Sequence, residues 1–139
     1  TYFLIEKDHL YIMERILIPS GSPFEKTIGF SRAVRMGNLI SVSGTAPIAD
    51  GKSAFVGDAY EQTKLCLSII KKAIEDAGGT LENTIRTRMY LTESKNWEAV
   101  AKAHGEFFRD IRPASTMLVV KELLSPDWLI EIEADCVVD

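Results

Sequence analysis

Residues 129–138 read LIEIEADCVV, a stretch in which apolar and acidic side chains alternate. Successive side chains of a β-strand point to opposite faces of a sheet, so this period predicts a strand with one face in a core. Its other face carries three carboxylates, those of Glu131, Glu133 and Asp135. A solvated sheet face is the general explanation of such a pattern. The alternative is a polar cleft or subunit interface in which one carboxylate acts.

A second β-rich run precedes this strand. Residues 112–120 read RPASTMLVV, and the connection between the runs contains the turn sequence Ser125-Pro126-Asp127. Two strand-like runs joined by a short connection are typical of neighbouring strands. We therefore predict that they pair with each other.

In the chain before residue 112, apolar residues recur every two residues in some segments and every 3.6 residues in others. The first spacing is typical of strands and the second of helices. Gly37-Asn38 is a two-residue hairpin signal, and Asp58 can cap a helix that Gly78-Gly79 ends. The order β-ββ-α-β-α-ββ predicts an α+β domain with helices on one face of a mixed sheet. The predicted upstream elements are a strand at 13–19, a hairpin at 30–43, an irregular connection at 45–52, a helix at 58–77, a strand at 85–92 and a helix at 96–110.

Length and composition predict one cytoplasmic domain. The chain has 139 residues, and we assign 13–139 to the domain and 1–12 to an N-terminal extension of uncertain status. A formal net charge of −4 argues against a nucleic-acid partner bound through a basic surface. Its apolar runs are too short to span a bilayer, which argues against a membrane partner. Cys66 and Cys136 lack metal-ligand spacing, so buried free thiols are expected.

Few residue patterns in the chain carry chemistry by themselves. His9 lies in the extension and His104 on the apolar side of a predicted helix, so no two-histidine acid-base site is expected. We predict that His104 is packed in the interior. Phosphate-binding and metal-ligand signatures are absent from the sequence, which predicts neither a metal nor a cofactor. What remains is carboxylate, arginine and hydroxyl chemistry on a sheet face.

Four short motifs, in this order and spacing, resemble the Rid family of reactive-intermediate deaminases, also called YjgF or L-PSP. The resemblance covers about residues 13–138 and implies a chorismate-mutase-like fold and a homotrimer. It also implies that the sheets form a barrel-like core, with small-molecule pockets in the clefts between neighbouring subunits. The motifs are GFSRAVR at 29–35, VSGTAP at 42–47, AGG at 77–79, and RPA at 112–114 followed by IEIEA at 130–134.

Active members of that family hydrolyse enamines and imines such as 2-aminoacrylate to 2-keto acids and ammonia without a cofactor. The resemblance implies that Glu131 helps to position the attacking water. It also implies an arginine after Pro113-Ala114 that holds the substrate carboxylate as a bidentate pair. This chain has Ser115 there and so resembles members that lack the substrate-carboxylate arginine. An amino-acid-derived imine should then react poorly, since each lost charged hydrogen bond is worth about 1.5–3 kcal/mol.

Other candidate substrate-binding residues also follow from the resemblance. Phe30 replaces a pocket tyrosine, Met117 replaces a small cysteine and Ala101 replaces a common asparagine. Arg86 matches a common lysine, and Arg88 stands where a small residue is usual. We hypothesise that Arg88 binds an anionic group, and the alternative is a structural ion pair with Glu131 or Glu133 across the trimer interface. The candidate substrate-binding residues are Phe30, Ser43, Gly44, Arg86, Arg88, Ser115 and Met117.

Three functions remain open from the sequence. Glu131 favours a hydrolytic deaminase whose substrate is an imine or enamine other than 2-aminoacrylate. The serine at position 115 favours a non-catalytic trimer that binds a metabolite or acts like a chaperone. Endoribonuclease activity, also claimed for the family, fits least because the chain is acidic and lacks a histidine pair.

Overall fold

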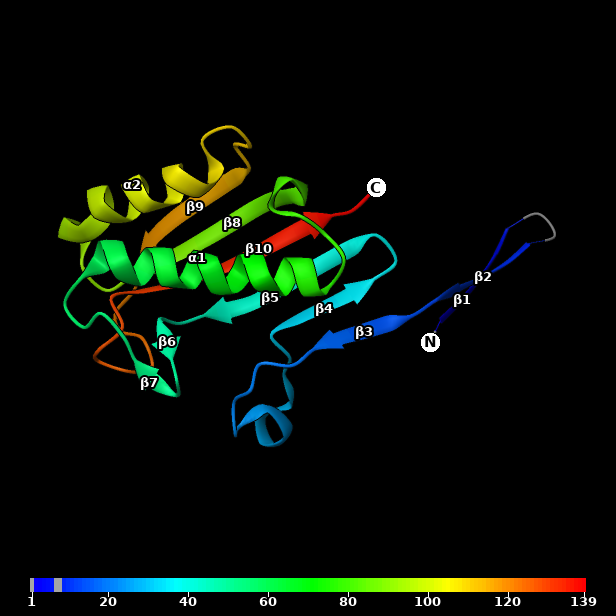
Figure 1. The fold of residues 1–139 in the computed structure, drawn as a ribbon, viewed down its shortest axis with the longest axis horizontal. Helices are drawn as coiled ribbons and strands as arrows, with labels where there is room; N and C mark the ends of the chain where they lie inside the picture. The colour runs from blue at the N-terminus through cyan, green and yellow to red at the C-terminus, as the bar shows by residue number, and fades with distance from the viewer. Residues whose placement is uncertain (1, 7–8) are drawn as a thin grey trace.

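Two helices cover one face of a six-stranded sheet (Figure 1). The structure is a computed structural model that describes residues 2–6 and 9–139, with side chains described from Met13 onward. The sheet order is β3-β4-β5-β10-β8-β9, and β8 and β9 form its parallel pair. This arrangement confirms the predicted α+β class with helices on one face of a mixed sheet. The strands are β3 (Arg15–Ile18), β4 (Ala33–Met36), β5 (Leu39–Thr45), β8 (Thr84–Leu91), β9 (Ala114–Val119) and β10 (Ile130–Val137).

The last two strands do not pair, so the prediction that they are neighbours was wrong. β10 lies between β5 and β8 and is antiparallel to both, whereas β9 is the outer strand beside β8. A strand, a crossing helix and a parallel strand form a unit in which the second strand lies next to the first. The connection after β9 then carries the chain past β8 to the centre of the sheet. Sequence proximity therefore suggested the wrong partner.

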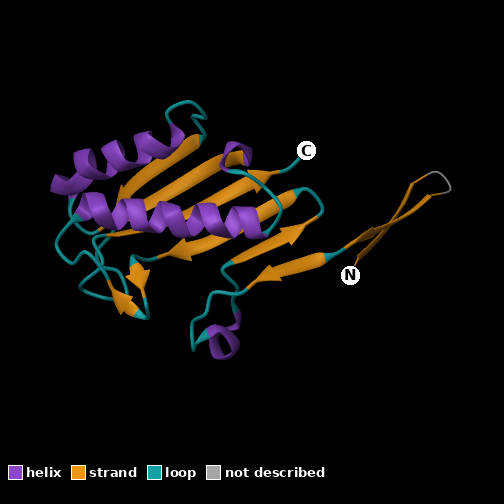
Figure 2. Ribbon diagram, viewed as in Figure 1, coloured by secondary structure: helices purple, strands orange, loops and turns teal. Residues whose placement is uncertain are grey.

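Helix α1 (Ala59–Asp76) begins and ends as predicted. The Asp58 side chain accepts a hydrogen bond from the backbone N–H of Glu61 at 3.0 Å and thereby caps the first turn. Gly78, at φ 88°, follows the helix in a conformation that glycine adopts at low cost. Helix α2 (Trp97–Phe108) covers the β8 and β9 side of the sheet (Figure 2).

The core lies between the helices and the apolar face of the sheet. On β10, Ile130, Ile132 and Ala134 are buried and the intervening acidic residues are only half-buried, as their alternation predicts. Helix α1 contributes a buried apolar stripe that includes Leu67 and Ile70. Cys66 and Cys136 are buried free thiols, which confirms that prediction.

Two small hairpins flank this body. Strands β6 (Ile48–Ala49) and β7 (Lys52–Ser53) pair where we predicted an irregular connection, because the two-residue Asp50-Gly51 turn adopts positive φ at both positions. Strands β1 (Tyr2–Glu6) and β2 (His9–Met13) form a hairpin that extends away from the sheet (Figure 1). The side chains of residues 1–12 lie outside the described part.

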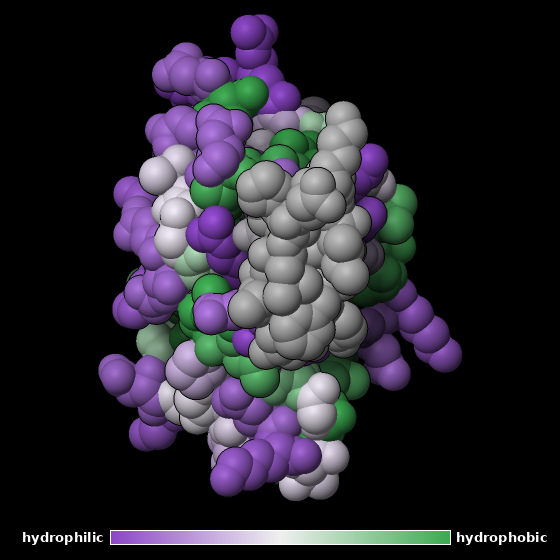
Figure 3. Space-filling view, turned by 90° about the vertical axis from the view of Figure 1, so that its right-hand side faces the viewer, coloured by the Kyte–Doolittle hydropathy of each residue, from purple (hydrophilic) through white to green (hydrophobic). Residues whose placement is uncertain are grey.

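On the end of the molecule seen in Figure 3, hydrophobic residues (green) are interspersed among hydrophilic ones (purple). Within the described residues, no helix has both the length and the apolar character needed to cross a membrane.

Candidate functional site

The open face of the sheet carries the acidic row of β10, and two of its three carboxylates are held by ion pairing. Nη1 of Arg88 lies 3.4 Å from Oε1 of Glu133 and 3.2 Å from Oδ2 of Asp135. The Tyr90 hydroxyl donates to Oε1 of Glu133 at 2.8 Å, and the Ser41 hydroxyl donates to Asp135 at 3.0 Å. These contacts bind β5, β10 and β8 together across the open face.

Arg88 therefore forms an ion pair within one chain. Its partners are Glu133, one of the two carboxylates that the alternative named, and Asp135, which it did not name. The alternative in the sequence analysis placed this pair across a subunit interface. Within one chain the pair forms because Glu133 stands directly opposite Arg88 on the neighbouring strand. This geometry favours a structural role for Arg88 over anion binding.

Glu131 is the member of the row that these contacts leave out. Glu131 lies near the start of β10 and is half-buried. It forms no ion pair within 4.0 Å among the described residues. Burial raises the pKa of its carboxyl above the ordinary value, the nearby Arg32 charge opposes this effect and the Glu133 charge adds to it. A half-buried carboxyl with a raised pKa is a candidate proton acceptor.

Two further candidate residues, Ser43 and Gly44, lie beside Glu131 on the adjacent strand β5. A Cβ built on Gly44 would lie only 3.1 Å from Oε1 of Glu131, so glycine permits the close approach of this carboxylate. The Ser43 hydroxyl donates to the carbonyl of Ser31 at 2.7 Å. This bond fastens the segment that follows the half-buried Phe30 to β5.

A cavity of about 730 Å³ opens beside Glu131. Its walls come from the end of β8, from the connection between β9 and β10, and from the start of β10. Cavities of this size are typical of small-molecule sites. The residues that line it include Lys121, Ser125, Leu129 and Glu131.

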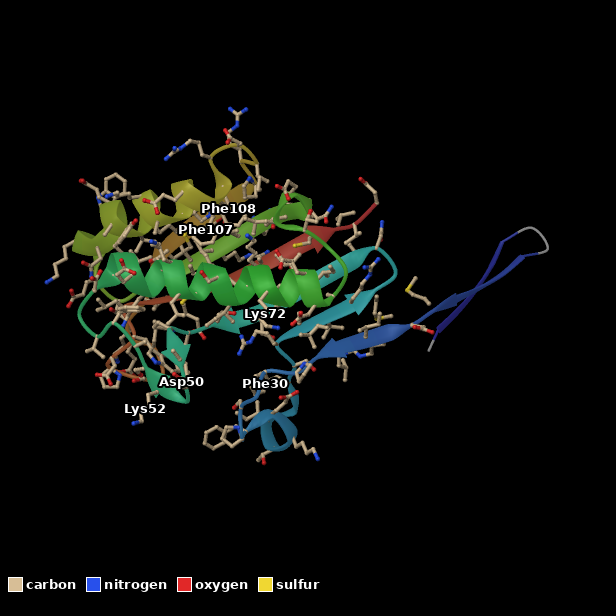
Figure 4. The ribbon with its side chains drawn as sticks, in the orientation of Figure 1. Phe30, Asp50, Lys52, Lys72, Phe107 and Phe108 are labelled. Carbon is tan, nitrogen blue, oxygen red and sulfur yellow. The ribbon has the colours of Figure 1, made fainter. Side chains whose placement is uncertain are left out.

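Ser115 and Met117 lie away from Glu131 within one chain, because β8 separates their strand from β10. The exposed Ser115 accepts a hydrogen bond at 2.9 Å from Thr87, whose hydroxyl also bonds Nε2 of His104 at 2.9 Å. Met117 packs against the core cluster. The same two ends of the sheet are marked in Figure 4 by Phe30, before β4, and by Phe107 on α2, which covers the β8 and β9 end.

Arg86 and His104 complete the set of predicted residues. Arg86 lies on β8 opposite Asp135, on the open face but four residues along the strand from Tyr90, which pairs with Glu131. His104 is half-buried, its ring centroid is 4.6 Å from that of Phe108, and burial lowers its pKa. The prediction that His104 is packed in the interior holds only in part, since its ring contacts Phe108 but is half-buried, and its bond to Thr87 was not predicted.

Two residues near Glu131 are not marked as functional by any pattern in the sequence. Arg32 is part of the motif at 29–35, but its proximity to Glu131 arises only when β4 and β5 come together. Gln62 is fully buried on α1 and bonds the connection before β10. A lone polar residue in an amphipathic helix could have suggested Gln62, but two of its partners, Asp127 and Leu129, are more than 60 residues away in the sequence.

The raised pKa of Glu131 has a consequence for stability. The folded protein binds this proton more tightly than the unfolded chain does, so the stability contributed by this group is greatest at low pH and is lost as pH rises through the folded pKa. We expect the variant Glu131→Gln, which cannot ionise, to gain thermal stability relative to the wild type as pH rises from acidic toward neutral. Melting temperatures of both proteins across this range would check it. Parallel curves would contradict the expectation.

Comparisons with known proteins agree with the fold. A family model described as Endoribonuclease L-PSP matches residues 22–138. An uncharacterised protein of Streptomyces coelicolor is 38% identical and covers 85% of this chain and 88% of its own length. The 3-aminoacrylate deaminase RutC of Acinetobacter baylyi is 32% identical, covering 86% of this chain and 94% of its own. The crystal structure of a YjgF-family member from Mycobacterium tuberculosis has a TM-score of 0.82 at 41% identity, covering 90% of this chain and 100% of that chain.

Proposed function

Because the chain belongs to the endoribonuclease L-PSP family, also called Rid or YjgF, we propose that it is a hydrolytic deaminase of imine or enamine intermediates. The observation that carries this proposal is Glu131, which is half-buried beside a cavity and free of a direct ion pair among the described residues. Its neighbours Glu133 and Asp135 are engaged by Arg88. The relative named 3-aminoacrylate deaminase supports the reaction class.

The proposed reaction needs one well-placed carboxylate. An enamine first becomes the imine by moving one proton from its nitrogen to its β-carbon. Glu131 then accepts a proton from a water molecule as the water oxygen attacks the carbon of the C=N bond. The C–N bond of the resulting tetrahedral adduct then breaks, and the nitrogen leaves as ammonia with the protons supplied by the water. In sum, an imine and water give a carbonyl compound and ammonia.

We further propose that the active site forms between neighbouring subunits of a homotrimer. Within one chain, Ser115 and Met117 lie at the outer strand β9, whereas Ser43, Gly44 and Glu131 lie at β5 and β10. A cleft between two copies would bring the outer strand of one copy to the Glu131 side of the next. Exposed apolar residues such as Leu118 and Leu39, 51% and 55% exposed, are surfaces that such an assembly would cover.

Ammonia release from 2-aminoacrylate and related imines generated in situ tests the proposal. We expect the wild type to release ammonia from some members of this series and to act poorly on 2-aminoacrylate, because Ser115 offers a hydroxyl where a carboxylate needs a cation. The absence of ammonia release from every member would contradict the proposal.

The variant Ser115→Arg provides a second prediction. A new charged hydrogen bond of about 1.5–3 kcal/mol corresponds to a rise in kcat/KM for 2-aminoacrylate of about 10–100-fold. Ser115→Gln, which adds length without charge, is the matched control and should produce little gain. Equal effects of arginine and glutamine would show that charge at this position does not limit the reaction.

The alternative is a trimer that binds a metabolite without converting it. Ser115 favours this alternative, since it removes the cation expected at the substrate carboxylate. In the ammonia assay, an inactive wild type together with an active Ser115→Arg variant would identify a scaffold whose native task is binding.

A further inference from the structure

Arg32 is held rigidly at the edge of the site. Its backbone N–H donates to the carbonyl of Ile18 at 2.8 Å, and its own carbonyl accepts from the N–H of Ser43 at 2.9 Å. Its Nη1 donates to the carbonyl of Gly44 and to the hydroxyl of Thr45, both at 2.9 Å. The guanidinium is therefore positioned before any ligand arrives, which lowers the entropic cost of binding.

The charge of Arg32 is not neutralised by a direct ion pair among the described residues. The salt bridges there involve Lys72, Arg88 and Lys95 instead. Both acceptors of Arg32 are neutral oxygens and both are reached by Nη1. Its Nε and Nη2 groups have no hydrogen-bond partner among the described residues. Burial lowers the pKa of Arg32, and the charge that opposes this effect most is that of Glu131. A half-buried cation of this kind favours an anionic partner.

Arg32 and Glu131 meet at the same residue. Arg32 bonds the carbonyl of Gly44, while Oε1 of Glu131 approaches the position of a Cβ on Gly44 at 3.1 Å. An anion bound by Arg32 would therefore lie on the Glu131 side of the sheet. Arg88 cannot serve in the same way without breaking its contacts with Glu133 and Asp135.

We propose that Arg32 binds the carboxylate of an imine or enamine substrate and thereby supplies part of the binding that the cation missing at Ser115 would give. This inference rests on the proposed function and moves the anion anchor from β9 to the segment before β4. The planar guanidinium can hold a carboxylate through two hydrogen bonds, so the site would prefer acidic imines to uncharged ones.

The competing explanation is that Arg32 is only a structural tie between β4 and β5. Arg35 provides the matched control, because it is half-buried, donates to the carbonyls of Gly37 and Ala77, and lies three residues further along. Replacing either arginine by glutamine removes a charge and shortens the side chain equally. A purely structural role would give both variants the same phenotype, namely lower thermal stability.

The experiment measures binding of pyruvate and of uncharged pyruvamide by calorimetry, with melting temperatures recorded in parallel. We expect Arg32→Gln to weaken pyruvate binding about 10-fold or more, and Arg32→Lys to restore part of it. Pyruvamide binding should be unchanged in both variants, and Arg35→Gln should bind both compounds as the wild type does. Equal pyruvate affinity in wild type and Arg32→Gln, including no binding by either, would overturn the proposal, as would a parallel loss of pyruvamide binding.

Ammonia release separates this inference from the proposed function. If the wild type binds pyruvate through Arg32 but releases no ammonia from any imine, the anchor stands and the deaminase proposal fails. If ammonia is released and neither pyruvate binding nor KM for acidic imines depends on Arg32, the anchor fails and the deaminase proposal stands.

Discussion

Replacing Glu131 by glutamine is expected to lower the rate of ammonia release by about 10²–10⁴-fold, the range typical for the loss of one general base. Glutamine keeps the size of the side chain and a hydrogen-bonding oxygen but cannot accept the proton of the attacking water. The loss should appear in kcat rather than in pyruvate binding, because the anion is assigned to Arg32. Steady-state kinetics on the best imine substrate and calorimetry on the same samples would check both statements.

Glu133→Gln is the matched control for this prediction. Glu133 lies on the same face of β10, but its carboxylate is bonded to Arg88 and Tyr90. Its replacement should therefore lower thermal stability slightly and leave kcat within a few-fold of the wild type. If both variants lost activity to the same extent, the row of carboxylates would act through its overall charge, and Glu131 would have no special role.

Replacing Gln62 by leucine is expected to lower the free energy of unfolding by about 2–4 kcal/mol, because it leaves buried backbone groups without partners. Gln62 is fully buried, and its Nε2 donates to the carbonyls of Ala54 and Asp127 at 3.1 and 2.8 Å. Its Oε1 accepts the N–H of Leu129 at 2.9 Å. Leucine has a similar volume and offers none of these contacts. Urea unfolding of the variant and the wild type would measure the difference.

The loss of Gln62 should also affect the site. Leu129 lines the cavity beside Glu131 and lies two residues before it, so loosening the Asp127 to Leu129 segment would displace a wall of the cavity. Lys71→Leu, at an exposed position of the same helix, is the control and should change stability by less than about 0.5 kcal/mol. A Gln62→Leu variant as stable as this control would show that water or local rearrangement replaces the three bonds.

The local elements of this fold were predictable because their signals are local. The alternation on β10, the Gly37-Asn38 turn and the Asp58 cap depend on residues close together in sequence, and each lies where it was expected. The small β6 and β7 hairpin was missed because its strands are only two residues long and show no period. The family resemblance supplied Glu131, which no period distinguishes from Glu133 or Asp135.

The sequence alone thus determined α1, α2, the strands of the six-stranded sheet, the buried face of β10 and the family. Tertiary structure decided which strands are neighbours, because pairing depends on how the α2 crossover places β9 beside β8 and leaves the centre of the sheet to β10. It also separated three similar carboxylates: Arg88 faces Glu133 and Asp135 across the register, whereas Glu131 lies at the cavity near Arg32. The reason is physical, since the pKa and the bonding of a carboxylate depend on charges and burial brought from distant parts of the chain.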